Sequence, residues 1–304
     1  MDTTQGSSEI RTVHVKNDKF RIKTTNQCNM NCWFCHKEGI HTSKDVVLDQ
    51  AFSDAILRFR EVFNRVHLTG GEPFLYPHLS EMLRFLSSAG YKISITTNGS
   101  IRLRDTDMKL LDLLSYVNVS FHSTEPEYYN TLTGQDNGQF FVDRIRNNIQ
   151  EIRKTVPVRI NTVVGDNVQS QKLVNMIHFA QEMHCELKFV PELKVRLQAM
   201  RTIDELIKAE GYILQERVLI TPGSNLRERF INQSGHCIEI KKLQPYHPRE
   251  LCKKCKLAGN CPEGFSFFRI GGNPLYAQTC INAEPMDYYR FLKEKWQTLR
   301  DEML

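Results

Sequence analysis

Three cysteines near the start of the chain have a spacing that suits metal ligands. Cys28, Cys32 and Cys35 form a C-x3-C-x2-C segment that directly follows a β-like run. Three thiolates on one short loop can hold three corners of a cubane iron–sulfur cluster, which leaves one iron open to bind a small molecule. The alternative is a zinc knuckle with His36 as its fourth ligand. The spacing alone favours the iron–sulfur cluster without excluding zinc.

A second cysteine group lies near the end of the chain. Cys252, Cys255 and Cys261 form a C-x2-C-x5-C segment, and Cys280 follows it. Four thiolates can hold a zinc ion or an iron–sulfur cluster whose irons are all ligated by the protein, and the spacing does not decide between them. The cysteines number nine and are clustered. This usage is typical of metal ligands in a reducing compartment rather than of a secreted disulfide framework.

The elements that must position these cysteines alternate between short β-like runs and amphipathic helical stretches. The strands are predicted at Phe20–Thr25, Arg65–Thr69, Lys92–Thr97, Tyr116–His122, Val158–Val164 and Glu186–Val190. The helices between them are predicted at Leu79–Ala89, Asp105–Leu114, Phe140–Lys154 and Ser170–Met183. The alternation predicts an α/β fold with a parallel sheet. Six such units suit a partial (β/α)6 TIM-like barrel, followed by a small C-terminal iron–sulfur domain.

Polar groups gather at the predicted ends of these strands. Functional residues of parallel barrels lie at the C-terminal strand ends, so we expect one shared site there. Its glycines would let a ligand approach the backbone, and the carboxylate of Glu72 could bind an ammonium group. The candidates are Gly70, Gly71, Glu72, Pro73, Thr96, Ser120, His122 and Asn161.

Composition sets the broad class of the protein. Hydrophobic residues make up 40% and charged residues 25% of the 304 residues, with a formal net charge of +5. The charges are scattered, which gives no basis for a nucleic-acid partner. The N-terminus carries no signal-like apolar stretch, and no apolar run is long enough to span a membrane. We therefore expect a cytoplasmic protein with no membrane partner.

The chain is expected to divide into three parts. Residues 1–19 are predicted to form a flexible lead-in, residues 20–215 the barrel, and residues 216–304 the small auxiliary domain. The last part is rich in loop signals, and a metal cluster would support it. Helices are expected at Ile203–Ala209 and Met286–Leu304.

These motifs resemble the radical S-adenosylmethionine (SAM) superfamily. An aromatic residue, Phe34, precedes the last cysteine of the first loop, and the Gly-Gly-Glu-Pro motif is intact. Residues 20–193 most resemble the GTP 3′,8-cyclase family of molybdenum cofactor biosynthesis, in the runs Val117–Gly138, Arg159–Val164 and Leu187–Val190.

The resemblance implies a cofactor set and a set of contacts. The first three cysteines would hold a [4Fe–4S] cluster whose open iron is chelated by SAM. The backbone near Gly71 and Glu72, the side chain of Ser120 and the backbone near Leu193 would contact SAM. One electron, from a flavodoxin- or ferredoxin-type donor, would then give a 5′-deoxyadenosyl radical.

The second cysteine group resembles the auxiliary-cluster ligands of the domains called SPASM and twitch. A full SPASM domain carries a further cysteine where this chain has Phe265, so the resemblance implies one auxiliary [4Fe–4S] cluster rather than two. The cyclase family instead has a C-x2-C-x13-C pattern, an arginine-rich spacer and a Gly-Gly tail. None of these is present, so we expect no cyclisation of GTP.

Three residues are candidates for binding the substrate. Arg21 and Arg159 fall where the cyclase family binds its nucleotide, and His67 replaces a basic residue of that family; the two arginines could equally form ordinary ion pairs. The leading hypothesis is hydrogen abstraction from a small polar metabolite (a sugar, aminocyclitol or nucleoside), leading to oxidation, epimerisation or rearrangement. The alternatives are a peptide-modifying radical SAM enzyme and a non-catalytic zinc-binding protein.

Cys237 has no place in the four-cysteine pattern. A buried structural thiol is the ordinary fate of such a residue, and an alternative cluster ligand is a second possibility. A third hypothesis makes it a catalytic hydrogen donor. If it faces the barrel mouth, its S–H group could quench a substrate radical and so invert a stereocentre.

Overall fold

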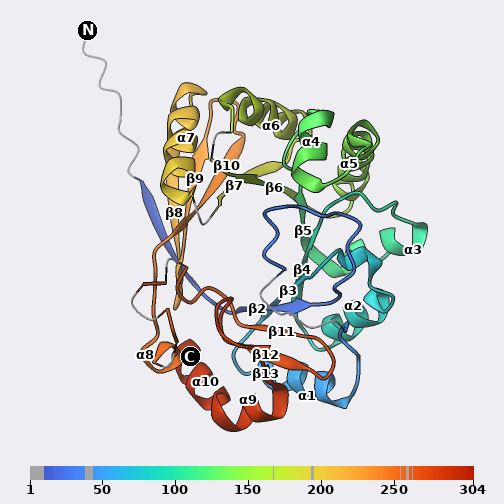
Figure 1. Cartoon of the computed structure of the whole chain (residues 1–304), viewed down its shortest axis with the longest axis vertical. Coiled ribbons are helices and arrows are strands. Elements are labelled where there is room, and N and C mark those ends of the chain that lie inside the picture. The colour runs from blue at the N-terminus through green and yellow to red at the C-terminus, as the bar shows by residue number, and fades with distance from the viewer. Residues whose placement is uncertain are drawn as a thin grey trace.

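The computed structural model describes residues 10–37, 44–166, 168–192, 195–253, 255–257, 260–261 and 263–304 (Figure 1). The described strands form one 13-stranded sheet in the order β1-β8-β9-β10-β7-β6-β5-β4-β3-β2-β11-β12-β13. Strands of the first part of the chain are β1 (Arg11–Lys16), β2 (Lys19–Lys23), β3 (Arg65–Thr69), β4 (Lys92–Thr97), β5 (Leu114–Ser120), β6 (Val158–Val164) and β7 (Glu186–Pro191). The later strands are β8 (Ile213–Thr221), β9 (Asn225–Ile231), β10 (Cys237–Leu243), β11 (Arg269–Gly271), β12 (Tyr276–Gln278) and β13 (Met286–Asp287).

The sheet curls into a ring with helices on its outside (Figure 1). The α-helices are α1 (Gln50–Phe59), α2 (Leu79–Ser88), α3 (Asp105–Met108), α4 (Pro126–Thr133), α5 (Gly138–Ile152), α6 (Ser170–Glu182), α7 (Arg196–Ala209), α8 (Arg249–Cys252), α9 (Tyr288–Glu294) and α10 (Trp296–Met303). Two 3₁₀ turns, η2 (Pro73–Leu75) and η3 (Leu111–Leu113), complete the described elements.

Strands β2 to β7 are parallel neighbours and form the predicted partial barrel. Strand β10 extends it in parallel beside β7, and β9 and β8 follow as antiparallel neighbours. Strand β1 pairs with β8 at the far end, although only two residues separate β1 from β2. The side chain of Asn17, in that link, donates to the carbonyl oxygens of Pro222 (2.8 Å) and Ser266 (3.1 Å). The link therefore connects β1, at one end of the sheet, with β2.

The apolar core lies between the outer face of the ring and the helices. Inward and outward side chains alternate along each strand, and the outward ones, such as Phe20 and Ile22 on β2, are completely buried. Phe20 packs edge-on against Phe59 of α1, with ring centroids 5.5 Å apart. Burying an aromatic side chain of this size contributes roughly 1.5–3 kcal/mol. The polar face of the strands is thereby left to line the interior of the ring.

The structure corrects several expected boundaries. Residues 11–16 of the expected flexible lead-in form strand β1, and the expected domain boundary between residues 215 and 216 lies inside β8. The expected helix at Asp105–Leu114 consists of α3 and η3, and the terminal helix is divided into α9 and α10. Three described helices, α1, α4 and α8, were not predicted as separate elements. No described helix has the length and apolar character that crossing a membrane would require.

Candidate active site

The first cysteine loop begins where β2 ends, at the C-terminal edge of the parallel strands. Met30 anchors this loop because its side chain is buried and its sulfur accepts a hydrogen bond from Tyr129 Oη (3.7 Å). The backbone N–H of Asn31 donates to the carbonyl of Thr133 (2.8 Å) at the end of α4. The loop is thus held between β2, from which it starts, and α4, which it contacts, while Cys28 and Cys35 remain exposed.

The Gly-Gly pair after β3 lies directly against the chain that leads into this loop. A Cβ atom on Gly71 would stand 2.1 Å from the carbonyl oxygen of Gln27, and one on Gly70 would stand 2.6 Å from that of Thr25. The N–H of Gly71 donates to Thr25 O (2.8 Å), and the N–H of Glu72 donates to Gln27 O (2.7 Å). The absence of side chains at Gly70 and Gly71 therefore lets two segments of the protein's own backbone lie against each other. The expected approach of a ligand to these glycines stays a prediction.

Glu72 has an internal role that differs from the expected contact with an ammonium group. Its side chain is completely buried and accepts hydrogen bonds from Thr97 Oγ1 (2.7 Å), Asn98 N (2.7 Å) and Phe74 N (3.1 Å). Burial raises the pKa of Glu72 to about 7 despite these donors. Pro73, also buried, starts the 3₁₀ turn that follows. The carboxylate ties the loops after β3 and β4 together.

Asn98 links the cysteine loop to β4, and the sequence reasoning did not select it. Its side-chain amide donates to Asn29 Oδ1 (2.8 Å) and lies 3.9 Å from the sulfur of Cys28. The amide of Asn29 donates in turn to Ser100 Oγ (2.8 Å). Asn98 belongs to the Thr-Thr-Asn-Gly segment that closes β4, so the signal was present, but only the first strand-end residue, Thr96, was chosen.

His67 and Ser94 are buried, and with the partly exposed Thr96 they form a polar layer on β3 and β4. The ring nitrogens of His67 contact Ser94 Oγ and Thr96 Oγ1, both at 2.8 Å. Thr96 also accepts from the side-chain amide of Asn118 (3.3 Å). His67, expected to bind substrate, therefore uses both nitrogens within the protein.

Ser120 is the last residue of β5, His122 follows two positions later, and Asn161 lies in the middle of β6. Ser120 of β5 is in register with Asn161 of β6, whose buried Oδ1 has no hydrogen-bond partner among the described atoms. His122 Nδ1 accepts from the backbone N–H of Val163 (3.2 Å), so its proton is on Nε2. Burial lowers the pKa of His122 to about 4, which keeps the ring neutral near pH 7. The ring of Phe34 stacks edge-on against it at 4.9 Å. Leu193 lies outside the described residues.

The chemistry of the thiols can be tested against the expected cluster. Burial and the nearby Cys35 and Cys28 raise the pKa of Cys32 to about 12. Three thiolates this close together need a positive group to compensate their charge. Within the described residues, no three or more His, Cys, Asp or Glu side chains form a group that could hold a metal ion. Three thiols on one loop supply three corners of a cubane cluster, whereas a structural zinc site uses four protein ligands.

A family model described as the radical SAM superfamily matches residues 22–180, more than half of the chain. The chain belongs to the radical SAM superfamily. A probable GTP 3′,8-cyclase of Saccharolobus islandicus (strain L.S.2.15 / Lassen #1) is 31% identical over 248 residues, which cover 78% of this chain and 78% of that protein. A probable GTP 3′,8-cyclase of Methanothermobacter marburgensis is 26% identical, covering 80% and 81%. These relatives place the radical SAM chain in their family.

The fold of this radical SAM protein also matches solved structures. The structure of SuiB from Streptococcus suis bound to precursor peptide SuiA gives a TM-score of 0.52 at 15% identity, covering 66% of this chain and 48% of that chain. The chain thus spans about half the length of SuiB, and the likeness concerns the fold alone. The predicted superfamily and the predicted partial barrel are confirmed.

In the second cysteine group of the radical SAM chain, Cys252 ends α8, Cys255 and Cys261 lie between α8 and β11, and Cys280 follows β12. The neighbouring thiols and burial raise the pKa of Cys252 to about 11, and the neighbours include Cys255, Cys261 and Cys280. Cys261 Sγ accepts from Gly264 N and from the Asn282 amide, both at 3.3 Å. The four thiols are therefore close neighbours, and N–H donors face one sulfur as they do in iron–sulfur proteins.

Phe265 stands where a full SPASM domain would carry a further cysteine. Its side chain is buried in the apolar core and is 2% exposed. A phenyl side chain supplies no metal ligand at this position, so the expectation of one auxiliary cluster rather than two stays a prediction.

Arg21 and Arg159, the expected substrate-binding arginines, lie on inward faces of the barrel. The guanidinium of Arg21 lies 4.6 Å from the ring centroid of Phe267. Arg159 forms an ion pair with Glu186 (2.6 Å) and lies 4.0 Å from Glu239. The ion-pair interpretation therefore holds for Arg159, although the pair faces the interior of the ring rather than open solvent.

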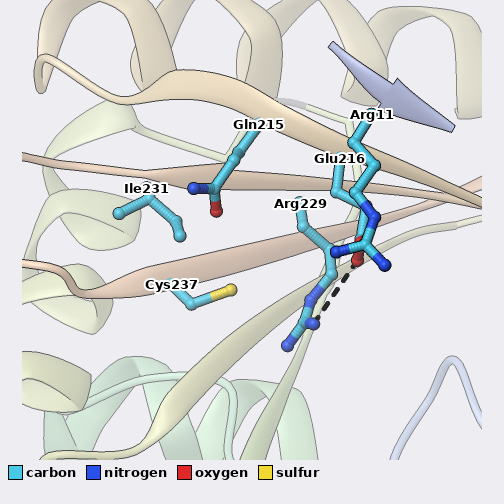
Figure 2. Close-up of a pocket in the computed structure, with 6 residues that line it drawn as sticks. All are labelled: Arg11, Gln215, Glu216, Arg229, Ile231 and Cys237. Carbon is cyan, nitrogen blue, oxygen red and sulfur yellow. Dashed lines mark ion pairs between the residues drawn. The ribbon is translucent and has the colours of Figure 1, made fainter. Parts of the chain in front are cut away.

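Cys237 lies at the opposite end of the barrel from the cysteine loop. It is the first residue of β10, whose next residue is in register with Leu187 near the start of β7. Its side chain lines a pocket of about 360 Å³ with Gln215, Ile231 and the ion-paired Arg229 and Glu216 (Figure 2). Burial raises the pKa of its thiol. The condition for the hydrogen-donor hypothesis, a place at the barrel mouth, is not met here.

Proposed function

We propose that this radical SAM enzyme abstracts hydrogen from a small polar metabolite that enters the ring of strands beneath the first cysteine loop. One observation supports this most strongly. On β6 and β7 the outward side chains are buried, whereas the inward ones are partly exposed in strict alternation. The interior of the ring is therefore open and polar, and it lies under the loop expected to hold the cofactors.

Some of the chain's residues would hold the cluster, and others would position the loops around it. Cys28, Cys32 and Cys35 would hold the [4Fe–4S] cluster, while Glu72 and Asn98 fix the loops around it. The cluster and SAM, when bound, supply a 5′-deoxyadenosyl radical that abstracts a hydrogen atom. The N–H groups of Gly71 and Glu72 already donate within the protein, so the backbone there would offer carbonyl oxygens to the SAM ammonium group.

The polar strand ends would then orient the cofactor and the substrate. His122, held neutral with its proton on Nε2, would act as a hydrogen-bond donor. Asn161 Oδ1, buried with no partner among the described atoms, would accept a hydrogen bond from a hydroxyl group of the ligand. A second cluster, the single auxiliary [4Fe–4S] cluster on the later cysteines, would carry electrons, because four protein ligands leave no iron open to substrate. Oxidation, epimerisation or rearrangement of the substrate would each be compatible with this arrangement.

A peptide-modifying reaction is the second candidate, and it is supported only by the fold shared with SuiB. The non-catalytic zinc alternative is weakened by the superfamily match.

The test is anaerobic SAM cleavage by the reconstituted protein under dithionite. The wild type should release 5′-deoxyadenosine, and a true substrate carrying deuterium should transfer the label to it. Cys185→Ala is a matched control, because that thiol lies in the core and donates to Met183 O (3.3 Å) far from either cysteine group. Absence of 5′-deoxyadenosine from a fully loaded wild type would refute the proposal.

A further inference from the structure

The interior of the ring extends well below the cysteine loop and is lined with charge. Arg159 on β6 and Lys188 on β7 face it, with side chains 20% and 12% exposed. Both surround the carboxylate of Glu239 on β10, which Lys188 contacts directly. Burial alone would raise the pKa of Glu239, but the surrounding cations, Lys188 first, hold it well below its usual range. One carboxylate is thus shared among several cations.

The hairpin of β9 and β10 adds two further cations to the same interior. Arg227 and Lys241 are direct partners across the hairpin, and Arg227 lies 3.7 Å from Glu239. Ile238 and Ile240, on the other face of β10, are completely buried, so Glu239 and Lys241 share the inward face. Both cations lie beyond residue 180, where the superfamily match ends.

The hairpin faces β2 and β11 across the ring. Burial lowers the pKa of Lys241 to about 8; Glu263 opposes this, and Arg21, Arg269 and Arg227 add to it. Tyr116 gives the geometric link between the two walls, because its ring centroid lies 5.6 Å from the guanidinium of Arg159, which in turn lies 4.0 Å from Glu239. Lys19 of β2 completes the group, with Nζ 3.5 Å from Tyr116 Oη.

Positive charge exceeds negative charge in this group. Five arginines and two glutamates have the largest electrostatic effects on Lys19, Lys188 and Lys241; they are Arg21, Arg65, Arg159, Arg227, Arg269, Glu239 and Glu263. Burial together with this surplus lowers the pKa of all three lysines. Clustering cations away from bulk water is costly unless an anion joins them. A fork of guanidinium and ammonium groups matches the oxygens of phosphate or carboxylate.

We propose that Arg227 and Lys241, with Lys19 and Arg21 on the opposite wall, form a seat for an oxyanion carried by the substrate. The inference rests on the proposed function, since it assigns part of the same interior to the same substrate. The substrate is then a polyhydroxylated metabolite with a phosphate or carboxylate group. The anion sits deep, and the hydroxyl-bearing carbons extend toward Asn118 and Asn161, whose buried Oδ1 atoms have no partner among the described atoms.

Residues 241 and 242 provide a matched pair of variants. Lys241 faces the interior, whereas Lys242 turns outward and pairs with Glu228 at 2.6 Å. Both substitutions to glutamine remove one positive charge from adjacent positions of one strand. Only Lys241→Gln removes it from the seat.

The test is isothermal titration calorimetry on the reconstituted full chain, with inorganic phosphate, malonate and uncharged myo-inositol as probes. Phosphate or malonate should bind, and comparing the two identifies the preferred oxyanion. Lys241→Gln and Arg227→Gln should each weaken that binding by about tenfold or more, and Lys242→Gln should change it less than about twofold. Iron content and circular dichroism of each variant establish that it has folded, and Lys19→Gln, on another strand, replaces any variant that has not.

Two results would overturn the proposal. One is a wild type that binds neither phosphate nor malonate, and the other is an equal loss of affinity in Lys242→Gln and Lys241→Gln. SAM cleavage without substrate, measured on the same preparations, separates this proposal from the function itself. Cleavage without anion binding refutes the seat alone, and anion binding without cleavage refutes the function alone.

Discussion

The barrel core, residues 19–191, and the later part of the chain, residues 213–304, hold their cysteines in different ways. In the core, three mostly exposed thiols stand on one loop that strand ends and side-chain amides hold in place. In the later part, four thiols come from separate segments, and Cys261 among them is buried. Exposure with three ligands suits a centre that meets a small molecule. Burial with four ligands suits a centre that supports structure or carries electrons.

The later part also does more than hold cysteines. Its strands β8 to β10 continue the barrel sheet and place charged side chains in the interior. The division between the two parts is therefore one of chemistry and not of separate folds. Variants that act on one part and spare the other can test it.

The largest effect is expected from replacing Cys28, Cys32 and Cys35 together with alanine. This variant should lose SAM cleavage, because thiolates are required to assemble the cluster. It should keep about four of roughly eight irons, on the order of four per cubane cluster. High-performance liquid chromatography of 5′-deoxyadenosine and an iron assay measure the two outcomes.

The reciprocal variant replaces Cys252 and Cys255 with alanine. It should lose about four irons and keep SAM cleavage in the absence of substrate, since its residues lie apart from the first loop. Zinc in the second group of the wild type would contradict the auxiliary-cluster prediction. Loss of SAM cleavage in both variants would show that the two parts depend on each other.

The strands of the barrel core could be predicted closely because their amino-acid composition is typical of buried strands. Three strands, Arg65–Thr69, Lys92–Thr97 and Val158–Val164, have the predicted bounds. Each is a short run rich in apolar and β-branched residues between polar loops, as a strand covered by helices should be. The cysteine spacing and the Gly-Gly-Glu-Pro motif then pointed to the superfamily that the family model matches.

The later strands were missed for a physical reason. In Cys237–Leu243 the apolar residues alternate with charged ones, which is the period of a strand with one polar face. A polar face ordinarily meets solvent, whereas here it lines the ring, so neither its burial nor its partners could be predicted from local sequence. The contacts of Glu239 with Lys188 and Arg227 join residues far apart in the chain. The internal roles of Glu72 and His67 depend in the same way on residues of neighbouring strands.

A moderate effect of pH is expected on the affinity for phosphate, through the charge that Lys241 contributes to the interior of the ring. The pKa of Lys241 in the folded protein is about 8, so its ammonium group is charged below that pH and neutral above it. Affinity for phosphate should therefore fall as pH rises from 7 to 9, by about tenfold. Calorimetry at the two pH values measures the change. In Lys241→Gln the phosphate affinity should depend less on pH, because the titrating ammonium group is gone and only the other cations remain. If the affinity of that variant fell with pH as steeply as that of the wild type, Lys241 would not be the source of the pH dependence.

A null result is expected with GTP, despite the names of the relatives. The cyclase family's three-cysteine pattern leaves an iron free to contact the nucleotide, whereas the fourth cysteine here, Cys280, lies beside the other three. The reconstituted protein should therefore form no cyclic pyranopterin precursor from GTP under conditions where it cleaves SAM. Product detected by mass spectrometry would overturn this and would make the second group an open site.

The smallest effect is expected from Cys237→Ala, which tests whether the far end of the barrel takes part in the chemistry. Quenching a substrate radical requires the thiol to reach the carbon that faces the first cysteine loop. The structure places Cys237 instead at the N-terminal end of the strands, beside Arg229 in a separate pocket (Figure 2).

This variant should keep all its iron and its SAM cleavage, and product formation should stay within about twofold. It should lose only about 1 kcal/mol of stability, as expected for truncating a half-buried side chain. Substrate turnover, iron content and thermal unfolding measure the three quantities. Cys237→Ser, which retains a polar group of similar size but with a stronger bond to hydrogen, is the matched control. If both variants kept SAM cleavage but stopped releasing product, the thiol would be the hydrogen donor and substrate would have to reach deeper than the cysteine loop implies. Loss of about four irons would instead make Cys237 a ligand of the second group.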